Sequence, residues 1–214
     1  LDNPHPYGIK NVLNDFHEWI EFLGKYSKTS DFDWYIKTHP DFKEETQALI
    51  KKFVKKYPHI KLVPAKTSHH QLIKEGINCA LTVHGTISWE YAYLKIPVIS
   101  ASSNTPHIGF NFCYHAKNKN DLSQAITNFK KLKLNYSRKE IYKFYFMHNI
   151  YANSNWMFGN LEMFLRKIKG YKNISNLIFH KYWIKSVNSK KINETEKKIN
   201  NLIKSKNFLI TREI

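Results

Sequence analysis

Small polar residues and histidines follow the segments of this chain that are expected to be buried strands. The clearest group, His84, Gly85, Thr86 and Ser88, comes directly after the apolar run 77–83. Glycine lets a ligand approach the backbone, and hydroxyls with free N–H groups at a helix start can bind a phosphate. A plain N-cap by Thr86 or Ser88 explains the same residues without a ligand. The spacing alone does not separate the two, and the GxxxxGK[ST] pattern of a P-loop is absent.

Three further residues are candidates for the same site. Glu90 lies one turn into the helix expected after residue 86, where its carboxylate can accept bonds from ribose hydroxyls. An exposed first-turn glutamate is the simpler interpretation. His39 and Lys37 stand at the end of the strand expected over 34–37. The imidazole of His39 can stabilise a leaving phosphate, although a loop histidine is more often merely exposed, and Lys37 either adds a positive charge there or points away.

The adjacent pair His69 and His70 is a weak metal signal. Neighbouring helical residues diverge by about 100°, and no carboxylate stands at ligand spacing, so we expect no metal site. Ser68, just before the pair, is a candidate N-cap. Either Ser68 or His69 is expected to face the ligand loops.

The spacing of apolar residues predicts the strands and helices that position these residues. Apolar runs predict strands at 34–37, 59–65, 77–83, 96–101 and 110–117, and amphipathic spacing predicts helices at 11–26, 41–57, 67–76, 86–95 and 121–132. Gly24 is expected near the end of the first helix. The alternation with short connections predicts an α/β fold, a Rossmann-like parallel sheet flanked by helices, with a helical C-terminal extension. Ligands of such sheets lie beyond the carboxyl ends of the strands, which is where the candidate residues gather.

The expected organisation has three parts, a lobe at 1–125, aromatic-rich helices at 126–170 that pack on it, and a basic helical tail at 171–214. A long helix is expected over 138–169, where aromatic residues at helical spacing favour core packing over a surface for stacking bases.

No apolar run is long enough to span a membrane. Cys79 and Cys113 lie in apolar stretches and are expected to be buried free thiols. The chain starts at Leu1 without a signal pattern, and we expect it to be part of a longer protein.

The net charge of +17 lies almost entirely in the second half of the 214-residue chain. Up to His107 there are 13 lysines against 11 acidic residues, and beyond it 21 basic residues against 6 acidic ones. Only three of the basic residues are arginines, whereas sequence-specific readers of nucleic acid rely on bidentate arginine. We therefore expect no nucleic-acid partner. The lysine-rich segment 167–206 is either a surface for anionic membranes or simply solvated.

Two segments together resemble the C-terminal, nucleotide-binding lobe of GT-B glycosyltransferases. They are WYIKTHPDF at 34–42 and LVPAKTSHHQLIKEGINCALTVHGTISWEYAYLKIPVIS at 62–100. The resemblance is greatest to bacterial capsule and surface-polysaccharide transferases, including retaining Kdo transferases and the CDP-glycerol polymerase group. It covers about residues 1–125, since the opening segment is similar to the interlobe region. The chain departs from that pattern at Lys95, where the family often has glycine, at His84, where it often has serine or asparagine, and in having a single glutamate in the helix.

The resemblance implies a set of roles. His39 would be the catalytic group at the nucleotide phosphate, and the binding residues would be Lys37, Ser68, His84, Gly85, Thr86, Ser88 and Glu90, with Glu90 at the ribose. The substrate would be a CMP-, CDP- or UDP-linked donor, used without a cofactor or metal. A sugar, or a group like glycerol phosphate, would pass to a hydroxyl of a saccharide or lipid-linked acceptor. A separate N-terminal lobe would bind that acceptor, so we expect this chain to bind nucleotide without turnover, in the cytoplasm or peripherally at the inner membrane.

Two alternatives remain open. A UDP-sugar 2-epimerase lobe shares the fold and a similar placement of His, Ser and Glu. A non-catalytic basic module for nucleic acid or membranes would use the positive charge of the second half, but it does not explain why polar residues follow each expected strand.

Overall fold

The computed structural model of the chain describes residues 11–38, 44–151, 161–170, 173–186 and 189–205. The chain divides into two compact units, Leu1–Phe144 and Tyr145–Ile214. Each unit is described by itself.

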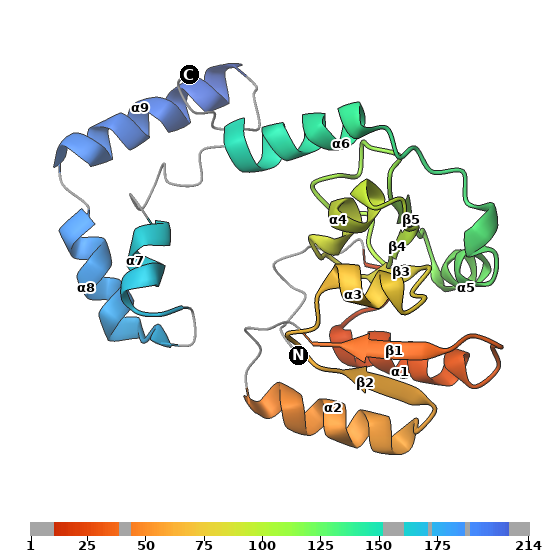
Figure 1. The fold of residues 1–214 in the computed structure, drawn as a ribbon. Coiled ribbons are helices and arrows are strands. Elements are labelled where there is room, and N and C mark those ends of the chain that lie inside the picture. The colour runs from red at the N-terminus through yellow and green to blue at the C-terminus, as the bar shows by residue number, and fades with distance from the viewer. Residues whose placement is uncertain (1–10, 39–43, 152–160, 171–172, 187–188, 206–214) are drawn as a thin grey trace. The chain divides into compact units, whose positions relative to one another are not determined.

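The first unit alternates strands and helices (Figure 1). Its elements are α1 (Phe16–Ser27), β1 (Trp34–Lys37), α2 (Glu44–Lys56), β2 (Ile60–Val63), α3 (His69–Lys74), β3 (Ala80–Thr82), α4 (Ile87–Tyr93), β4 (Val98–Ser100), β5 (Tyr114–His115), α5 (Lys119–Thr127), a 3₁₀ turn (Phe129–Lys131) and α6 (Arg138–Tyr145). The predicted α/β class, with parallel strands flanked by helices, is confirmed.

The strands form two short parallel sheets instead of the single sheet expected. In one, β1 pairs with β2 from Trp34↔Ile60 to Lys37↔Val63. In the other, β4 lies between β3 and β5. Among the described residues no ladder joins β1 or β2 to β3, β4 or β5, and one apolar cluster takes side chains from both sheets. The arrangement is compatible with a Rossmann-like fold, and the carboxyl ends of β3, β4 and β5 share one edge.

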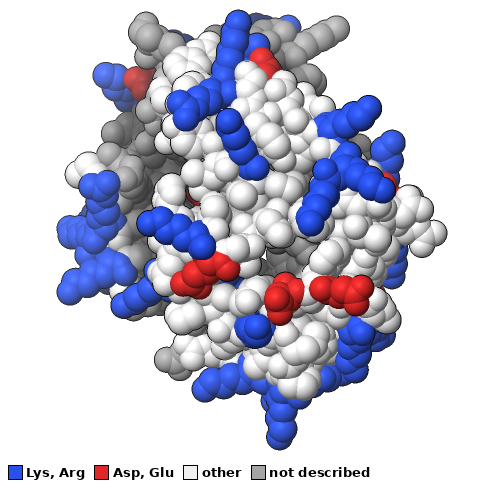
Figure 2. Space-filling model, turned by 45° about the vertical axis from the view of Figure 1, so that its right-hand side comes forward, with Lys and Arg blue, Asp and Glu red and all other residues white. Residues whose placement is uncertain are grey.

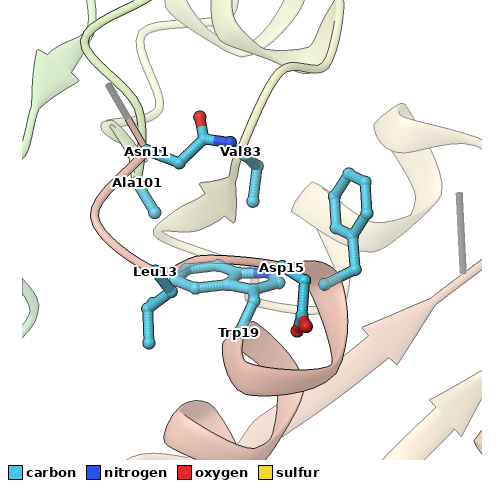
Figure 3. Close-up of a pocket in the computed structure, with 7 residues that line it drawn as sticks. Asn11, Leu13, Asp15, Trp19, Val83 and Ala101 are labelled. Carbon is cyan, nitrogen blue, oxygen red and sulfur yellow. The ribbon is translucent and has the colours of Figure 1, made fainter. Parts of the chain in front are cut away.

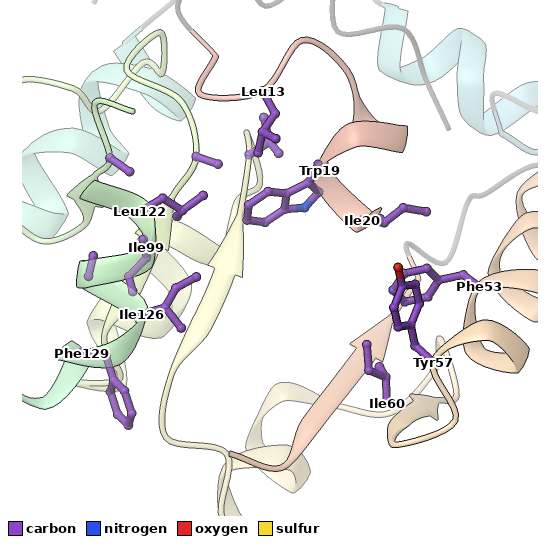
Figure 4. Close-up of a cluster of buried hydrophobic side chains, with 14 residues drawn as sticks. Leu13, Trp19, Ile20, Phe53, Tyr57, Ile60, Ile99, Leu122, Ile126 and Phe129 are labelled. Atoms are coloured by element: carbon purple, nitrogen blue, oxygen red, sulfur yellow. The ribbon is translucent and has the colours of Figure 1, made fainter. Parts of the chain in front are cut away.

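The core is continuous across both sheets (Figure 4). Strand β4 is fully buried, with Val98, Ile99 and Ser100 each 0% exposed, as a parallel strand covered on both faces requires. A second cluster forms around Tyr91, Phe112 and Phe144. Phe144 belongs to α6, so part of the aromatic-rich segment is core, as predicted, whereas its neighbour Tyr145 is exposed.

Gly24 lies inside α1 and does not end it. The helix ends at Ser27, three residues later, so Gly24 lies near the end of the helix, as predicted. A Cβ atom on Gly24 would lie 2.5 Å from Cε2 of Tyr57. Glycine is present because α1 approaches the Tyr57 ring there, which is a matter of packing between elements.

The segment expected to be one long helix changes geometry at Phe146. Helix α6 ends at Tyr145, Phe146–Tyr151 is a π-helix, and α7 covers Leu161–Lys167. A single regular α-helix over 138–169 is therefore wrong for the described residues. Such π segments widen the backbone turn, so the side-chain stripe of an α-helix does not continue through them.

The described part of the second unit is mainly helical, as expected of the tail. After α7 come α8 (Asn176–Ser186) and α9 (Ser189–Ser205). Phe164 of α7 stacks on Tyr182 of α8, with ring centroids 4.1 Å apart. None of the helices in the described residues combines the length and apolar character needed to cross a bilayer.

Figure 2 shows one face of the molecule, from which Lys and Arg side chains project at many places while Asp and Glu are few. On this face the positive side chains are scattered and do not gather into one compact patch.

Candidate functional site

The loops that follow β3 and β4 are joined directly. His84 Nε2 donates a hydrogen bond of 3.1 Å to the carbonyl of Asn104. Below this contact, the Ser100 hydroxyl lies 3.0 Å from the Val83 carbonyl and 3.1 Å from the Ser102 carbonyl. The carboxyl edge of the sheet is therefore a connected set of polar groups, as the sequence predicts.

The start of α4 leaves a hydroxyl exposed. Thr86 is the N-cap residue, yet its side chain makes no capping hydrogen bond, and the residue is exposed. The Gly85 amide donates to Thr82 Oγ1 at 3.0 Å, and a Cβ on Gly85 would lie 2.8 Å from that oxygen. Glycine is thus required by the tight turn, and the simple N-cap that the sequence allows for Thr86 is not what forms.

Ser88 lies inside the protein. It is 0% exposed, so its hydroxyl does not reach the surface beside Thr86. Burial raises the pKa of the nearby Cys113 thiol to about 12, against the opposing effect of the Ser88 hydroxyl. The structure therefore separates these two predicted site residues, although both belong to the turn into α4.

Glu90 and His69 face each other between α4 and α3. Glu90 Oε2 lies 3.5 Å from His69 Nε2, and both side chains are partly exposed. His69 Nδ1 is hydrogen-bonded to the hydroxyl of Tyr91 at 3.1 Å. Because a carboxylate only accepts, the neutral ring places its proton on Nε2 and accepts from Tyr91 through Nδ1.

The end of β1 contributes to the same region. Burial lowers the pKa of His69, the Glu90 carboxylate opposes this shift, and the positive charge of Lys37 adds to it. Lys37 thus acts on His69 through its charge, whereas the contact in this region is between His69 and Glu90. The sequence considered His69 for a metal, which was not expected, or as a residue facing the ligand loops.

Ser68 performs the capping role that the sequence allows. Its side chain accepts a 3.1 Å hydrogen bond from the Gln71 amide at the start of α3. His70, two residues after Ser68, is exposed. His39, the predicted catalytic residue, lies outside the described residues.

Three residues that the sequence analysis did not single out for a site converge at the start of β5. His107, Cys113 and His115 each offer a ligand atom, and these atoms lie within 4.8 Å of one another. The available signal was Cys113-x-His115, since residues two apart on a strand share a face. His107 could not be assigned to the cluster from the sequence, because the fold of the intervening loop brings it there.

Two spaces lie near the carboxyl edge. A cavity lined by Asn11, Leu13, Trp19, Val83 and Ala101, among others, has a volume of about 10 Å³, room for one water molecule at most (Figure 3). An open groove of about 450 Å³ runs past Asn11, Val12 and residues 117–120. This groove is shallow and open to solvent, with Lys117 and Lys119 in its lining, and it does not include Lys37, His69, Thr86 or Glu90.

Comparison of the chain with protein-family models, with curated proteins and with solved structures gives no match, so the case for a function rests on this geometry.

Proposed function

We propose that Lys37, His69, Thr86 and Glu90 bind the nucleotide part of a nucleotide-linked sugar donor. The chain would then be the nucleotide-binding lobe of a GT-B-type glycosyltransferase of bacterial surface-polysaccharide synthesis. The observation that carries the proposal is the start of α4, where an exposed Thr86 hydroxyl, not used by its own helix, stands one turn before the half-exposed carboxylate of Glu90.

Each group has a chemical role in this proposal. The Thr86 hydroxyl donates to a phosphate oxygen, and Lys37 supplies the positive charge that balances the phosphates. Glu90 accepts hydrogen bonds from two adjacent ribose hydroxyls. His69, held by Tyr91, orients that carboxylate when no nucleotide is bound and shares it when ribose arrives.

In the proposed reaction an acceptor hydroxyl attacks the anomeric carbon of the donor. The bond from that carbon to the phosphate oxygen breaks, and the nucleotide leaves with the electron pair. Positive charge at the phosphates lowers the energy of this leaving group, which is the part of catalysis that this lobe supplies. His39, one residue beyond Thr38, would add to it, and a second lobe would bind the saccharide or lipid-linked acceptor and take up its proton.

Calorimetric titration of the 214-residue chain with CMP, CDP, UMP, UDP, GDP and ADP tests the proposal. We expect saturable binding that favours one base. Thr86→Val and Glu90→Gln should each weaken it about tenfold or more, as the loss of hydrogen bonds to charged groups does. Glu75→Gln, which removes an exposed carboxylate at the end of α3, should leave it unchanged.

A preference for one base distinguishes specific nucleotide binding from non-specific electrostatic binding of anions to a basic protein. Equal weak binding of all six nucleotides, lost alike at raised salt, would contradict the proposal. So would base-selective binding that Thr86→Val and Glu90→Gln do not affect.

A further inference from the structure

A second site lies at the start of β5, where three side chains with metal-binding atoms meet. Cys113 immediately precedes β5 and His115 is the second residue of that strand, and their ligand atoms lie within 4.8 Å of each other. His107 reaches them through a turn in which the Ile108 amide donates to the Thr105 carbonyl at 3.1 Å and the Phe110 amide donates to the His107 carbonyl at 2.9 Å. The ring centroids of His107 and His115 are 5.0 Å apart.

The orientation of His115 is the one that a metal ligand requires. Its Nδ1 lies 3.2 Å from the carbonyl of Ser102, and because a carbonyl only accepts, Nδ1 carries the proton. The Nε2 atom then presents a lone pair. Metal-binding histidines are characteristically held in this way, by a hydrogen bond from the second ring nitrogen to a backbone carbonyl.

The Nε2 atom of His115 is also buried and makes no hydrogen bond of ordinary geometry with the described residues, although the backbone of His107 lies near the ring. A buried acceptor without a partner costs free energy, so it calls for an explanation. It lies in the same cluster as the ligand atoms of His107 and Cys113, residues that are 1% and 2% exposed.

We propose that His107, Cys113 and His115 bind one transition-metal ion of the Zn²⁺ type. One sulfur and two imidazole nitrogens suit such an ion, whereas Mg²⁺ and Ca²⁺ need oxygen ligands that this set lacks. Metal–ligand bonds of about 2.0–2.3 Å place ligand atoms roughly 3.5 Å apart, so side-chain movements of about 1 Å close the site.

The ion would fasten the loop between β4 and β5. Ser102, which orients His115, and Asn104, which accepts from His84, belong to that loop. The metal site would therefore hold one wall of the candidate nucleotide site in place, although it stands on observations of its own and does not depend on what that site binds.

Cobalt titration of the reduced, metal-free chain tests the proposal. We expect one Co²⁺ per chain, a charge-transfer absorption that reports a thiolate ligand, and displacement of Co²⁺ by Zn²⁺. Cys113→Ser should abolish that absorption. Cys79→Ser, which removes the other free cysteine, outside the cluster, should preserve it.

A histidine variant keeps the test decisive if Cys113→Ser fails to fold. In His115→Asn the amide nitrogen replaces the Nδ1 donor to Ser102, while the Nε2 ligand atom is lost. We expect this variant to bind Co²⁺ at least tenfold more weakly and its melting temperature to be insensitive to Zn²⁺, unlike that of the unaltered chain. The proposal is overturned if saturating Co²⁺ gives no thiolate band in the unaltered chain, if the band survives in folded Cys113→Ser, or if His115→Asn binds Co²⁺ as tightly as the unaltered chain.

Discussion

Gly76 and Lys95 occupy the same position at the ends of two consecutive helices, and both have a positive φ, 101° and 60°. After α3, the Gly76 amide donates to Ile73 and the next amide donates to Leu72. After α4, the Lys95 amide donates to Ala92 and the next amide donates to Tyr91. Both helices therefore end in a Schellman motif, which glycine fits and lysine strains.

Lys95→Gly should accordingly stabilise the protein. A side chain in the left-handed region costs about 1 kcal/mol, so the melting temperature should rise by about 2–4 °C. Gly76→Ala should lower stability by about 1 kcal/mol for the same reason, because no atom lies within 4 Å of the added Cβ and only the backbone is strained. Thermal unfolding of both variants checks the pair. If Lys95→Gly were equally stable or less stable, the Lys95 side chain of the unaltered chain would make contacts that outweigh the backbone strain.

These two helix ends show how far the sequence predicts this fold. Gly76 marks the end of α3 correctly, because glycine at a C-terminal position is a local signal. Gly24 is also a glycine near the end of a predicted helix, but the structure needs it for a different reason. The ring of Tyr57, a residue from a distant segment, approaches the helix there and leaves no room for a Cβ atom. The strands were located because apolar runs are local, whereas the split into two sheets depends on which ladders form between them.

The candidate site likewise has residues that the sequence predicts and residues that only the structure reveals. Residue type placed Thr86 and Glu90 at the carboxyl edge, and the structure agrees. Ser88 cannot be distinguished from Thr86 by type, and only the packing of α4 shows that one is buried and the other exposed. The contact of His69 with Glu90 joins two helices, so no spacing rule reveals it.

Gly24→Ala should destabilise the first unit. The added Cβ would meet Tyr57 at 2.5 Å, and the ring is fixed by a 2.9 Å hydrogen bond from its hydroxyl to Glu21. Overpacking of this kind costs about 1–3 kcal/mol, against about 1 kcal/mol that alanine gains over glycine within a helix. Urea unfolding should therefore show a net loss. Gly109→Ala, where no atom lies within 4 Å, is the matched control and should change stability by less than about 0.5 kcal/mol.

The burial of His69 predicts a pH dependence of stability. Its pKa lies below the ordinary value of 6.5, chiefly through burial, so the unfolded chain binds this proton more readily than the folded one. Stability should therefore fall as the pH drops from above 6.5 toward the folded pKa, and this contribution levels off below that. Urea unfolding at pH 7.5 and pH 5.5 should show a smaller loss for His69→Gln than for the unaltered chain. His17→Gln, at an exposed position of α1, should show the full loss, and an equal loss in all three proteins would refute the assignment to His69.

Cys79 should resist alkylation in the folded protein. Burial raises the pKa of its thiol to about 12, so it is not a thiolate at neutral pH. Mass spectrometry after iodoacetamide treatment should find Cys79 unmodified in buffer and modified in urea. Rapid labelling of Cys79 in the native protein would show that its half-buried position opens readily.

Helix α9 should bind anionic membranes. Ile192, Ile199 and Ile203 are 52%, 36% and 69% exposed and recur at helical spacing, beside lysines such as Lys197 and Lys198. A basic helix with exposed apolar residues suits the headgroup region, where each lysine contributes about 1 kcal/mol toward an anionic surface. Co-sedimentation with phosphatidylcholine vesicles should therefore require added phosphatidylglycerol, and replacing Lys197 and Lys198 by glutamate should reduce it at least tenfold. Binding that is indifferent to the anionic lipid would leave these lysines as an ordinary solvated surface, because attraction of this kind cannot act on a neutral bilayer.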